Sequence, residues 1–250
     1  MGSQADRIKG YQSAYLGDYG FEKTMVWARQ KYLVSLIKNT MPELVLEIGC
    51  GYDQLFEKVS DIPSIRKWTI IEPSDIFFAA GREKMAGDPR VEILQGYAEE
   101  IIGRTFPDKV ELCICSSLLH EVEQPERILH AARQCLCEGG ALHVNVPNAK
   151  SFHRLLACEM RLISSPYQLS ARNQDLMQRR VFDIETLRSL VENNGFVVVN
   201  SGGYFLKPFT HGQMEKLVEQ VGGNILEGLW RMGVNFPDMA GEIFVNGIRK

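Results

Sequence analysis

The sequence predicts an α/β protein with a doubly wound, mostly parallel seven-stranded sheet and an antiparallel edge strand. Short apolar segments alternate along the chain with stretches of helical periodicity, as expected for repeated strand-helix-strand units. The segment 110–115 is almost continuously apolar, which is typical of a parallel strand covered by helices on both faces. Another apolar stretch, 243–248, closes the chain after two helical segments, and we expect it to supply the antiparallel strand.

Five strands and their connecting helices are expected before Pro147. Apolar residues at helical spacing indicate a helix over 23–39. Ser74 is a candidate cap for the helix after the second strand. Pro125 begins another helix, which the glycine-rich segment 138–140 should break. The expected strands are 44–48, 68–72, 91–94, 110–115 and 142–146, with a short helix at about 54–59 after the first.

The pattern changes after Pro147. Residues 149–163 look helical, whereas 164–178 are polar and poorly periodic, so a lid is expected there. Regular structure then returns as a helix at 183–194, a strand at 196–199, helices at about 212–221 and 225–232, and the closing strand. Since no linker or repeat is present, we expect a single domain. Its parts are an N-terminal helical cap or flap (1–40), a lid or substrate insertion (149–180) and a helical excursion (210–232), all within 1–250.

The composition argues against several classes of partner. The chain is 45% hydrophobic and 24% charged with a formal net charge of -3, so we expect no nucleic-acid partner. Its apolar runs are far shorter than the roughly 20 residues that cross a bilayer. With no signal-peptide pattern at the amino terminus, we expect no membrane contact and a cytoplasmic location. The six cysteines mostly lie in apolar segments, so we expect reduced thiols and no metal site.

A glycine loop follows the first strand, in the sequence Glu47-Ile48-Gly49-Cys50-Gly51. Two residues without side chains there let the backbone approach a ligand at the carboxyl edge of the sheet. A nicotinamide or flavin dinucleotide would require a third glycine, which is replaced by Gln54, and Asp53 would oppose a pyrophosphate. Glu72, which ends the second strand, suits the hydroxyls of a ribose. The loop therefore favours a phosphate-free, cationic nucleoside such as S-adenosylmethionine over a dinucleotide, with a plain strand-to-helix turn as the structural alternative.

Five segments, in order and suitably spaced, resemble the motifs of class I (Rossmann-like) S-adenosylmethionine-dependent methyltransferases. They are 45–51, 71–74, 95–100, 115–122 and 136–142. The resemblance extends over roughly 11–250, and it implies a Rossmann-like fold with S-adenosyl-L-methionine as methyl donor and S-adenosyl-L-homocysteine as product. Two more segments, 145–154 and 202–208, resemble a subset that modifies small metabolites or sugars.

The resemblance also implies roles for single residues. Eight should contact the cofactor: Glu47, Gly49 and Ser116 near the methionine moiety, Gly51 near the nucleoside, Glu72 with Pro73 at the ribose, and Tyr97 with Ala98 beside the adenine. Two departures from the family pattern matter. Asp53 stands where the family often has a glycine, and Tyr97 where it often has an acidic residue. The adenine amino group should therefore be read by another side chain or by backbone.

Methyl transfer from a sulfonium requires in-line positioning of the acceptor rather than a protein nucleophile. A hydroxyl acceptor would also need a base, and His120 and His153 both follow the carboxyl ends of core strands. Their structural alternatives are a histidine bonded to backbone at a helix start and a surface residue of the lid helix. Arg154, Arg179 and Arg180 could hold an acidic or phosphorylated substrate, or could be solvated surface charges.

We therefore expect an enzyme that methylates an O or N atom of a small molecule, such as a sugar, a natural-product intermediate or another metabolite. The alternatives are a non-catalytic S-adenosylmethionine-binding protein and, less favoured, a nicotinamide-dependent oxidoreductase. Tyr11, Tyr15 and Tyr19 could fold over the cofactor as a flap or serve in ordinary helix packing. The sequence leaves the acceptor and the oligomeric state open.

Overall fold

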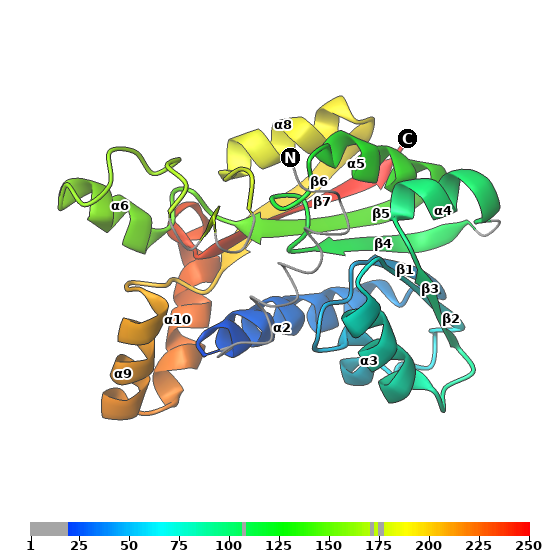
Figure 1. Ribbon diagram of the computed structural model, residues 1–250, viewed down its shortest axis with the longest axis horizontal. Coiled ribbons are helices and arrows are strands. Elements are labelled where there is room, and N and C mark those ends of the chain that lie inside the picture. The colour runs from blue at the N-terminus through cyan, green and yellow to red at the C-terminus, as the bar shows by residue number, and fades with distance from the viewer. Residues whose placement is uncertain (1–19, 107–108, 171–172, 175–177) are drawn as a thin grey trace.

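The computed structural model describes residues 20–106, 109–170, 173–174 and 178–250. It contains a seven-stranded sheet with helices on both faces (Figure 1), which confirms the predicted fold class. The strands are β1 (Leu44–Ile48), β2 (Lys67–Glu72), β3 (Val91–Gln95), β4 (Val110–Ser116), β5 (Leu136–Pro147), β6 (Phe196–Tyr204) and β7 (Glu242–Arg249). The helices are α2 (Glu22–Thr40), η1 (Leu55–Lys58), α3 (Asp75–Met85), α4 (Ala98–Thr105), α5 (Pro125–Cys135), α6 (Phe152–Glu159), α8 (Ile184–Asn193), α9 (His211–Val221), α10 (Asn224–Asn235) and η2 (Pro237–Met239).

The strand order creates a point at which the direction of winding reverses. The order across the sheet is β3-β2-β1-β4-β5-β7-β6, so the chain moves outward from β1 in one direction and outward from β4 in the other. The pairs β1–β2, β2–β3, β1–β4 and β4–β5 are all parallel. The carboxyl ends of these strands therefore meet at one edge, and a crevice forms there between β1 and β4.

Different helices cover the two faces of the sheet. In Figure 1, α4, α5 and α8 lie over one face, and α2 and α3 lie over the other. Side chains of β4 alternate between these layers because successive residues of a strand point to opposite faces. Cys113 and Cys115 belong to the apolar cluster under α5, and Leu112 and Ile114 belong to the cluster under α2. Burial on both faces explains why this strand is a continuous apolar run.

The start of β5 corrects one expectation. The sequence predicts a helix broken at 138–140 and a strand from Leu142, but α5 ends at Cys135 and β5 begins directly at Leu136. The pairing shifts from Val110–Leu136 to Leu112–Ala141, so the extra residues of β5 form an irregularity within the strand. Gly139 lies there at φ +74°, a conformation that favours glycine. The glycines therefore bend the strand instead of separating it from the helix.

The last strand is antiparallel, as expected from the closing apolar segment. Strand β7 pairs antiparallel with both β5 and β6. It lies one position in from the edge, and β6 is the outermost strand. Strand β6 is also longer than the predicted 196–199, because it continues past an irregularity between Val198 and Asn200 to Tyr204.

Helix α2 packs against the β6–β7 side of the sheet as well as beside the glycine loop. A third apolar cluster joins it to the ends of β6 and β7 and to α9. The indole Nε1 of Trp230, on α10, donates to the backbone oxygen of Ala28 at 3.0 Å. Lys31 pairs with Glu227 across the same contact. The helix thus crosses the sheet as a fixed element, whereas the predicted flap tyrosines Tyr11, Tyr15 and Tyr19 lie outside the described residues.

The segment between β5 and α8 leaves the sheet and returns to it, and its two ends lie side by side. Asn148 forms an isolated parallel bridge with Phe182. Asp183 then caps α8 by accepting from the backbone N of Thr186 at 2.9 Å. The same carboxylate accepts from Tyr167 Oη and pairs with Lys150 Nζ, each at 2.6 Å. These contacts tie the base of the excursion to the start of α8. None of the described helices is long and apolar enough to cross a membrane.

Candidate functional site

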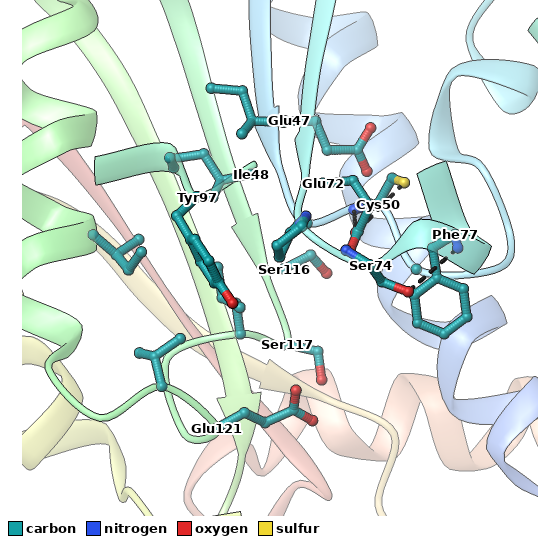
Figure 2. Close-up of a pocket in the computed structure, with 18 of the residues that line it drawn as sticks. Glu47, Ile48, Cys50, Glu72, Ser74, Phe77, Tyr97, Ser116, Ser117 and Glu121 are labelled. Atoms are coloured by element: carbon teal, nitrogen blue, oxygen red, sulfur yellow. Dashed lines mark hydrogen bonds between the residues drawn. The ribbon is translucent and has the colours of Figure 1, made fainter. Parts of the chain in front are cut away.

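A cavity of about 600 Å³ opens at the carboxyl ends of β1, β2 and β4, where the winding of the sheet reverses. Such reversal points are the usual ligand sites of doubly wound sheets. Helix α2 supplies one wall, and the turns that follow β3 and β4 supply others. The structure brings all eight predicted cofactor residues to this cavity: Glu47, Gly49, Gly51, Glu72, Pro73, Tyr97, Ala98 and Ser116. Glu47, Glu72, Tyr97 and Ser116 are labelled in Figure 2.

The glycine loop needs its glycines for backbone conformation. Gly49 and Gly51 have φ values of +78° and +60°, in the left-handed region that other residues rarely adopt. A β-carbon at Gly51 would meet no atom within 4 Å, so space is not what requires glycine there. Gln54, at the position of the missing third glycine, donates from Nε2 to the backbone oxygen of Gly51 at 3.0 Å. The side chain of Gln54 therefore closes the loop, at the position where a third glycine would let the backbone approach closely.

Glu72 holds the loop against the start of α3. Its Oε2 accepts from the backbone N of Cys50 at 3.1 Å, and its Oε1 accepts from the backbone N of Ser74 at 2.8 Å. Burial raises the pKa of this carboxyl, and hydrogen bonds from the backbone of Ser74, Cys50 and Gly51 partly offset that effect. A carboxylate oxygen can accept more than one hydrogen bond. Both oxygens thus retain capacity for the paired hydroxyls of a sugar. Ser74 accepts from the backbone N of Phe77 at 3.4 Å, which confirms it as the cap of α3.

Glu47 is a buried carboxyl beside Glu72. Its Oε2 accepts from the indole Nε1 of Trp68 at 3.0 Å. Burial raises the pKa of Glu47 to about 7; the hydrogen bond from Trp68 lowers it, and the charge of Glu72 raises it further. Near neutral pH the group is therefore poised between its neutral and ionised forms. A cation bound in the cavity would favour the ionised form.

The Glu47 carboxyl should make the folded protein less stable as the pH rises from about 4.5 to about 7. In that window the folded chain keeps a proton that the unfolded chain has released. Glu47→Gln should remove up to about 3 kcal/mol of this decline in the free energy of unfolding. Urea unfolding at about pH 5 and about pH 8 measures the difference. Parallel pH dependences in wild type and Glu47→Gln would contradict the assignment.

The turn after β4 is strained and faces the cavity. Ser117 has φ +54°, and its backbone N donates to the backbone oxygen of Asn145 at 3.0 Å. Non-glycine residues in this region are uncommon and often occur at functional sites. The turn places Ser116, Ser117, Leu118 and Glu121 in the cavity wall. In Figure 2, Ser117 and Glu121 lie at the opposite end of the view from Glu47.

His120, the first candidate base, lies behind this wall. It is 1% exposed and is not among the residues that line the cavity. Burial lowers the pKa of its ring to about 3, and the charge of Arg29 lowers it further. Neither ring nitrogen has a hydrogen-bond partner, so it is not the backbone-bonded histidine considered above. Its Nε2 lies 3.5 Å from Oε1 of Glu121.

The other predicted catalytic and substrate residues are dispersed. His153, on α6, does not line the cavity, and burial, with smaller effects from Lys207 and Arg154, holds its pKa well below the usual value. Arg154 donates to the backbone oxygens of Pro166 and Gln168, within the excursion after β5. Arg180 donates to the backbone oxygens of Val122 and Glu123, while Arg179 lines the cavity 3.8 Å from the Glu123 carboxylate. The structure thus brings one of these five residues to the cavity, and their catalytic and substrate roles stay predictions.

Arg29, which lines the cavity from α2, is a site residue that was not predicted from the sequence. Its guanidinium donates to both carboxylate oxygens of Glu242, at 3.2 and 2.6 Å, and to Glu22 at 2.9 Å. Glu242 also accepts from Asn145 Nδ2 at 3.0 Å. Helical spacing places Arg29 on the same face as the buried Met25 and Leu33. A charged residue on the apolar face of a helix was the signal that could have identified it.

Cys50 and the other thiols are free. Burial raises the pKa of the Cys50 thiol far above its usual value, and the charges of Glu72 and Glu47 raise it further. The thiol is therefore protonated and unreactive at neutral pH. Within the part of the chain that the structure describes, no group of three or more histidine, cysteine or acidic side chains is placed to hold a metal ion.

Comparison with known proteins agrees with this architecture. A family model described as a methyltransferase domain matches residues 28–201. Among solved structures, the plantazolicin methyltransferase BamL, in complex with a triazolic desmethylPZN analog and SAH, has a TM-score of 0.58 and 15% identity, covering 98% of this chain and 96% of its own. The N-methyltransferase NodS from Bradyrhizobium japonicum WM9, in complex with S-adenosyl-L-homocysteine, has a TM-score of 0.57 and 13% identity, covering 96% and 98%. The [4+2]-cyclase SpnF has a TM-score of 0.56 and 16% identity, covering 89% and 80%. No curated protein sequence matches the chain.

The family match spans more than half of the chain, and the structures share its fold. The chain therefore belongs to the methyltransferase domain family, with the class I, Rossmann-like fold. It is an S-adenosylmethionine-dependent methyltransferase, which confirms the resemblance found in the five sequence segments.

Proposed function

We propose that the enzyme transfers the methyl group of S-adenosylmethionine to an O or N atom of a small molecule. One observation carries the proposal. The eight residues expected at the cofactor converge on a single cavity. There the Glu72 carboxylate lies beside the glycine loop, in which Gly49 and Gly51 have left-handed backbone conformations. The volume of about 600 Å³ lies within the range of small-molecule sites.

The residues present suit each part of the cofactor. The donor supplies a methyl group on a sulfonium that leaves as a neutral thioether. Glu72 would accept hydrogen bonds from the ribose hydroxyls, and Tyr97 and Ala98 would flank the adenine. Glu47 would pair with the ammonium group in its ionised form, and Arg29 would attract the carboxylate of the methionine moiety. The buried acidic groups therefore match a cation, whereas they would repel a pyrophosphate.

We propose that residues 1–250 act as one domain in the cytoplasm. Within this domain, 1–40 would cap the cofactor, 149–180 would cover the acceptor and 210–232 would brace α2. The contact between Trp230 and Ala28 supports the last of these roles. The free thiols suit the reducing cytoplasm. No nucleic-acid partner is proposed, because the net charge is negative.

A release assay tests the proposed function. The enzyme is incubated with S-adenosylmethionine and a panel of small metabolites, and S-adenosylhomocysteine is quantified. We expect release above background with at least one acceptor. Binding of the cofactor without release from any acceptor would favour the non-catalytic alternative. A fluorescence titration in which reduced nicotinamide cofactor binds and S-adenosylmethionine does not would favour the oxidoreductase.

A further inference from the structure

We propose that Glu99 recognises the adenine of the cofactor by accepting a hydrogen bond from its exocyclic amino group. This inference rests on the proposed function, since it concerns the base of the same nucleoside. Glu99 is not one of the eight residues expected at the cofactor, yet it lines their cavity. It would determine which base the site accepts.

The turn after β3 places Glu99 at one end of the cavity. The backbone N of Gly96 donates to the backbone oxygen of Glu72 at 3.1 Å, so this turn is tied to the end of β2. Strand β3 lies beyond β2, on the side away from β1. A nucleoside with its ribose at Glu72 and its homocysteine moiety over β1 therefore directs its base toward this turn. Tyr97 and Ala98 line the cavity there, and Glu99 lines it from the first turn of α4.

The carboxylate of Glu99 needs a hydrogen-bond donor. Its Oε2 is shielded from solvent, and none of the described residues donates to it. An acceptor that is buried without a donor destabilises the state in which it is buried. A base that fills this end of the cavity would cover the side chain further, so the base must itself bring a donor. The exocyclic amino group of adenine is such a donor, whereas a 6-oxo purine presents an oxygen at the same place.

The cavity has other acidic residues, but they come from different elements. One group belongs to β1, its loop and β2, and the other to the segment between β4 and α5: Glu47, Asp53, Glu72, Glu121 and Glu123. The proposed complex places the first group at the methionine moiety and the ribose. Among the residues that line the cavity, Glu99 is therefore the acidic side chain contributed by the turn after β3.

Neighbouring polar groups are less suited to accept from an amino group. Three arginines also line the cavity: Arg29, Arg127 and Arg179. Guanidinium groups only donate, so they would favour an oxo base over an amino base. In Figure 2, the hydroxyl of Tyr97 points toward the end of the cavity where Ser117 lies. The backbone oxygen of Tyr97 already accepts from the backbone N of Glu100 and of Ile101, each at 3.0 Å.

The base preference of the site tests the proposal without turnover. Calorimetry compares S-adenosylhomocysteine with S-inosylhomocysteine, in which an oxygen replaces the amino group. Wild type should prefer the adenosyl ligand about 100-fold, because the carboxylate loses its donor and faces an oxygen. The amide of Glu99→Gln can accept from the amino group or donate to the oxygen. This variant should bind S-inosylhomocysteine more tightly than wild type does, and its preference should fall below about tenfold.

The expected gain in affinity separates this role from damage to the fold, since a disrupted site would not bind the analogue better. Glu100→Gln, at an exposed residue outside the cavity lining, should keep the wild-type preference. Equal affinity of wild type for the two ligands would overturn the proposal. The wild-type preference in folded Glu99→Gln, or its loss in Tyr97→Phe instead, would also overturn it. Failure to bind S-adenosylhomocysteine at all would instead refute the proposed function.

Discussion

Glu72→Ala is expected to weaken the binding of S-adenosylhomocysteine about 1000-fold while the protein remains folded. In the proposed complex the carboxylate accepts hydrogen bonds from both ribose hydroxyls. Each hydrogen bond to a charged acceptor contributes about 1.5–3 kcal/mol, so the loss of two corresponds to this change in Kd. Burial already raises the pKa of Glu72, so removing the buried charge offsets part of the loss of its contacts to Cys50 and Ser74. Isothermal titration calorimetry measures the affinity.

Two further variants separate this effect from damage to the loop. Glu72→Gln retains an oxygen acceptor, so its affinity should lie between those of wild type and Glu72→Ala. Glu92→Ala, on the neighbouring strand and outside the cavity lining, should bind as wild type does. Circular dichroism verifies that each variant is folded. Wild-type affinity in folded Glu72→Ala would refute the assigned ribose contact.

Gly233→Ala is expected to destabilise the protein by about 3 kcal/mol, because α10 crosses the end of β6 at this residue. An added β-carbon would lie 2.2 Å from the backbone N of Phe205 and 2.5 Å from the backbone carbon of Tyr204. These are main-chain atoms, so the clash cannot be relieved by rotation of a side chain. The helix must move away, which disturbs its contact with α2. Urea unfolding measures the change.

The same helix offers a matched control. Gly228 has no atom within 4 Å of an added β-carbon. Gly228→Ala should therefore stabilise the protein by about 0.5–1 kcal/mol, because alanine favours the helical backbone more than glycine does. The opposite signs of the two substitutions isolate close packing from helix propensity. Equal unfolding midpoints for the two variants would show that α10 does not pack on Phe205 as described.

The sequence predicts most of the fold because strands buried on both faces leave continuous apolar runs. Strand β1 has the bounds expected from 44–48, and β4 differs from 110–115 by one residue. The errors fall where glycines lie inside strands. Gly139 was expected in a break between a helix and the next strand, and the strand at 196–199 was expected to end before the pair Gly202-Gly203, yet β5 and β6 continue through these glycines. A β-carbon at Gly203 would lie 2.5 Å from that of Ala240, so close packing, which sequence periodicity does not encode, requires this glycine.

Residues of the site could be predicted from the sequence where the end of a strand fixes their position. Glu47, Gly49 and Glu72 reach the cavity because parallel strands present their carboxyl ends at one edge. Turns are different, since neighbouring residues can point in opposite directions. His120 was the candidate chosen from the turn after β4, whereas Glu121 lines the cavity. Arg29 comes from a helix far away in the sequence, and only tertiary packing brings it to the site.

A crystal structure of the enzyme soaked with S-adenosylhomocysteine tests the central claim most directly. We expect the nucleoside in the cavity between β1 and β4, with both ribose hydroxyls within hydrogen-bonding distance of Glu72 and the homocysteine moiety beside Gly49. A ribose bound away from Glu72, or a cavity that instead binds a pyrophosphate-containing ligand, would contradict it.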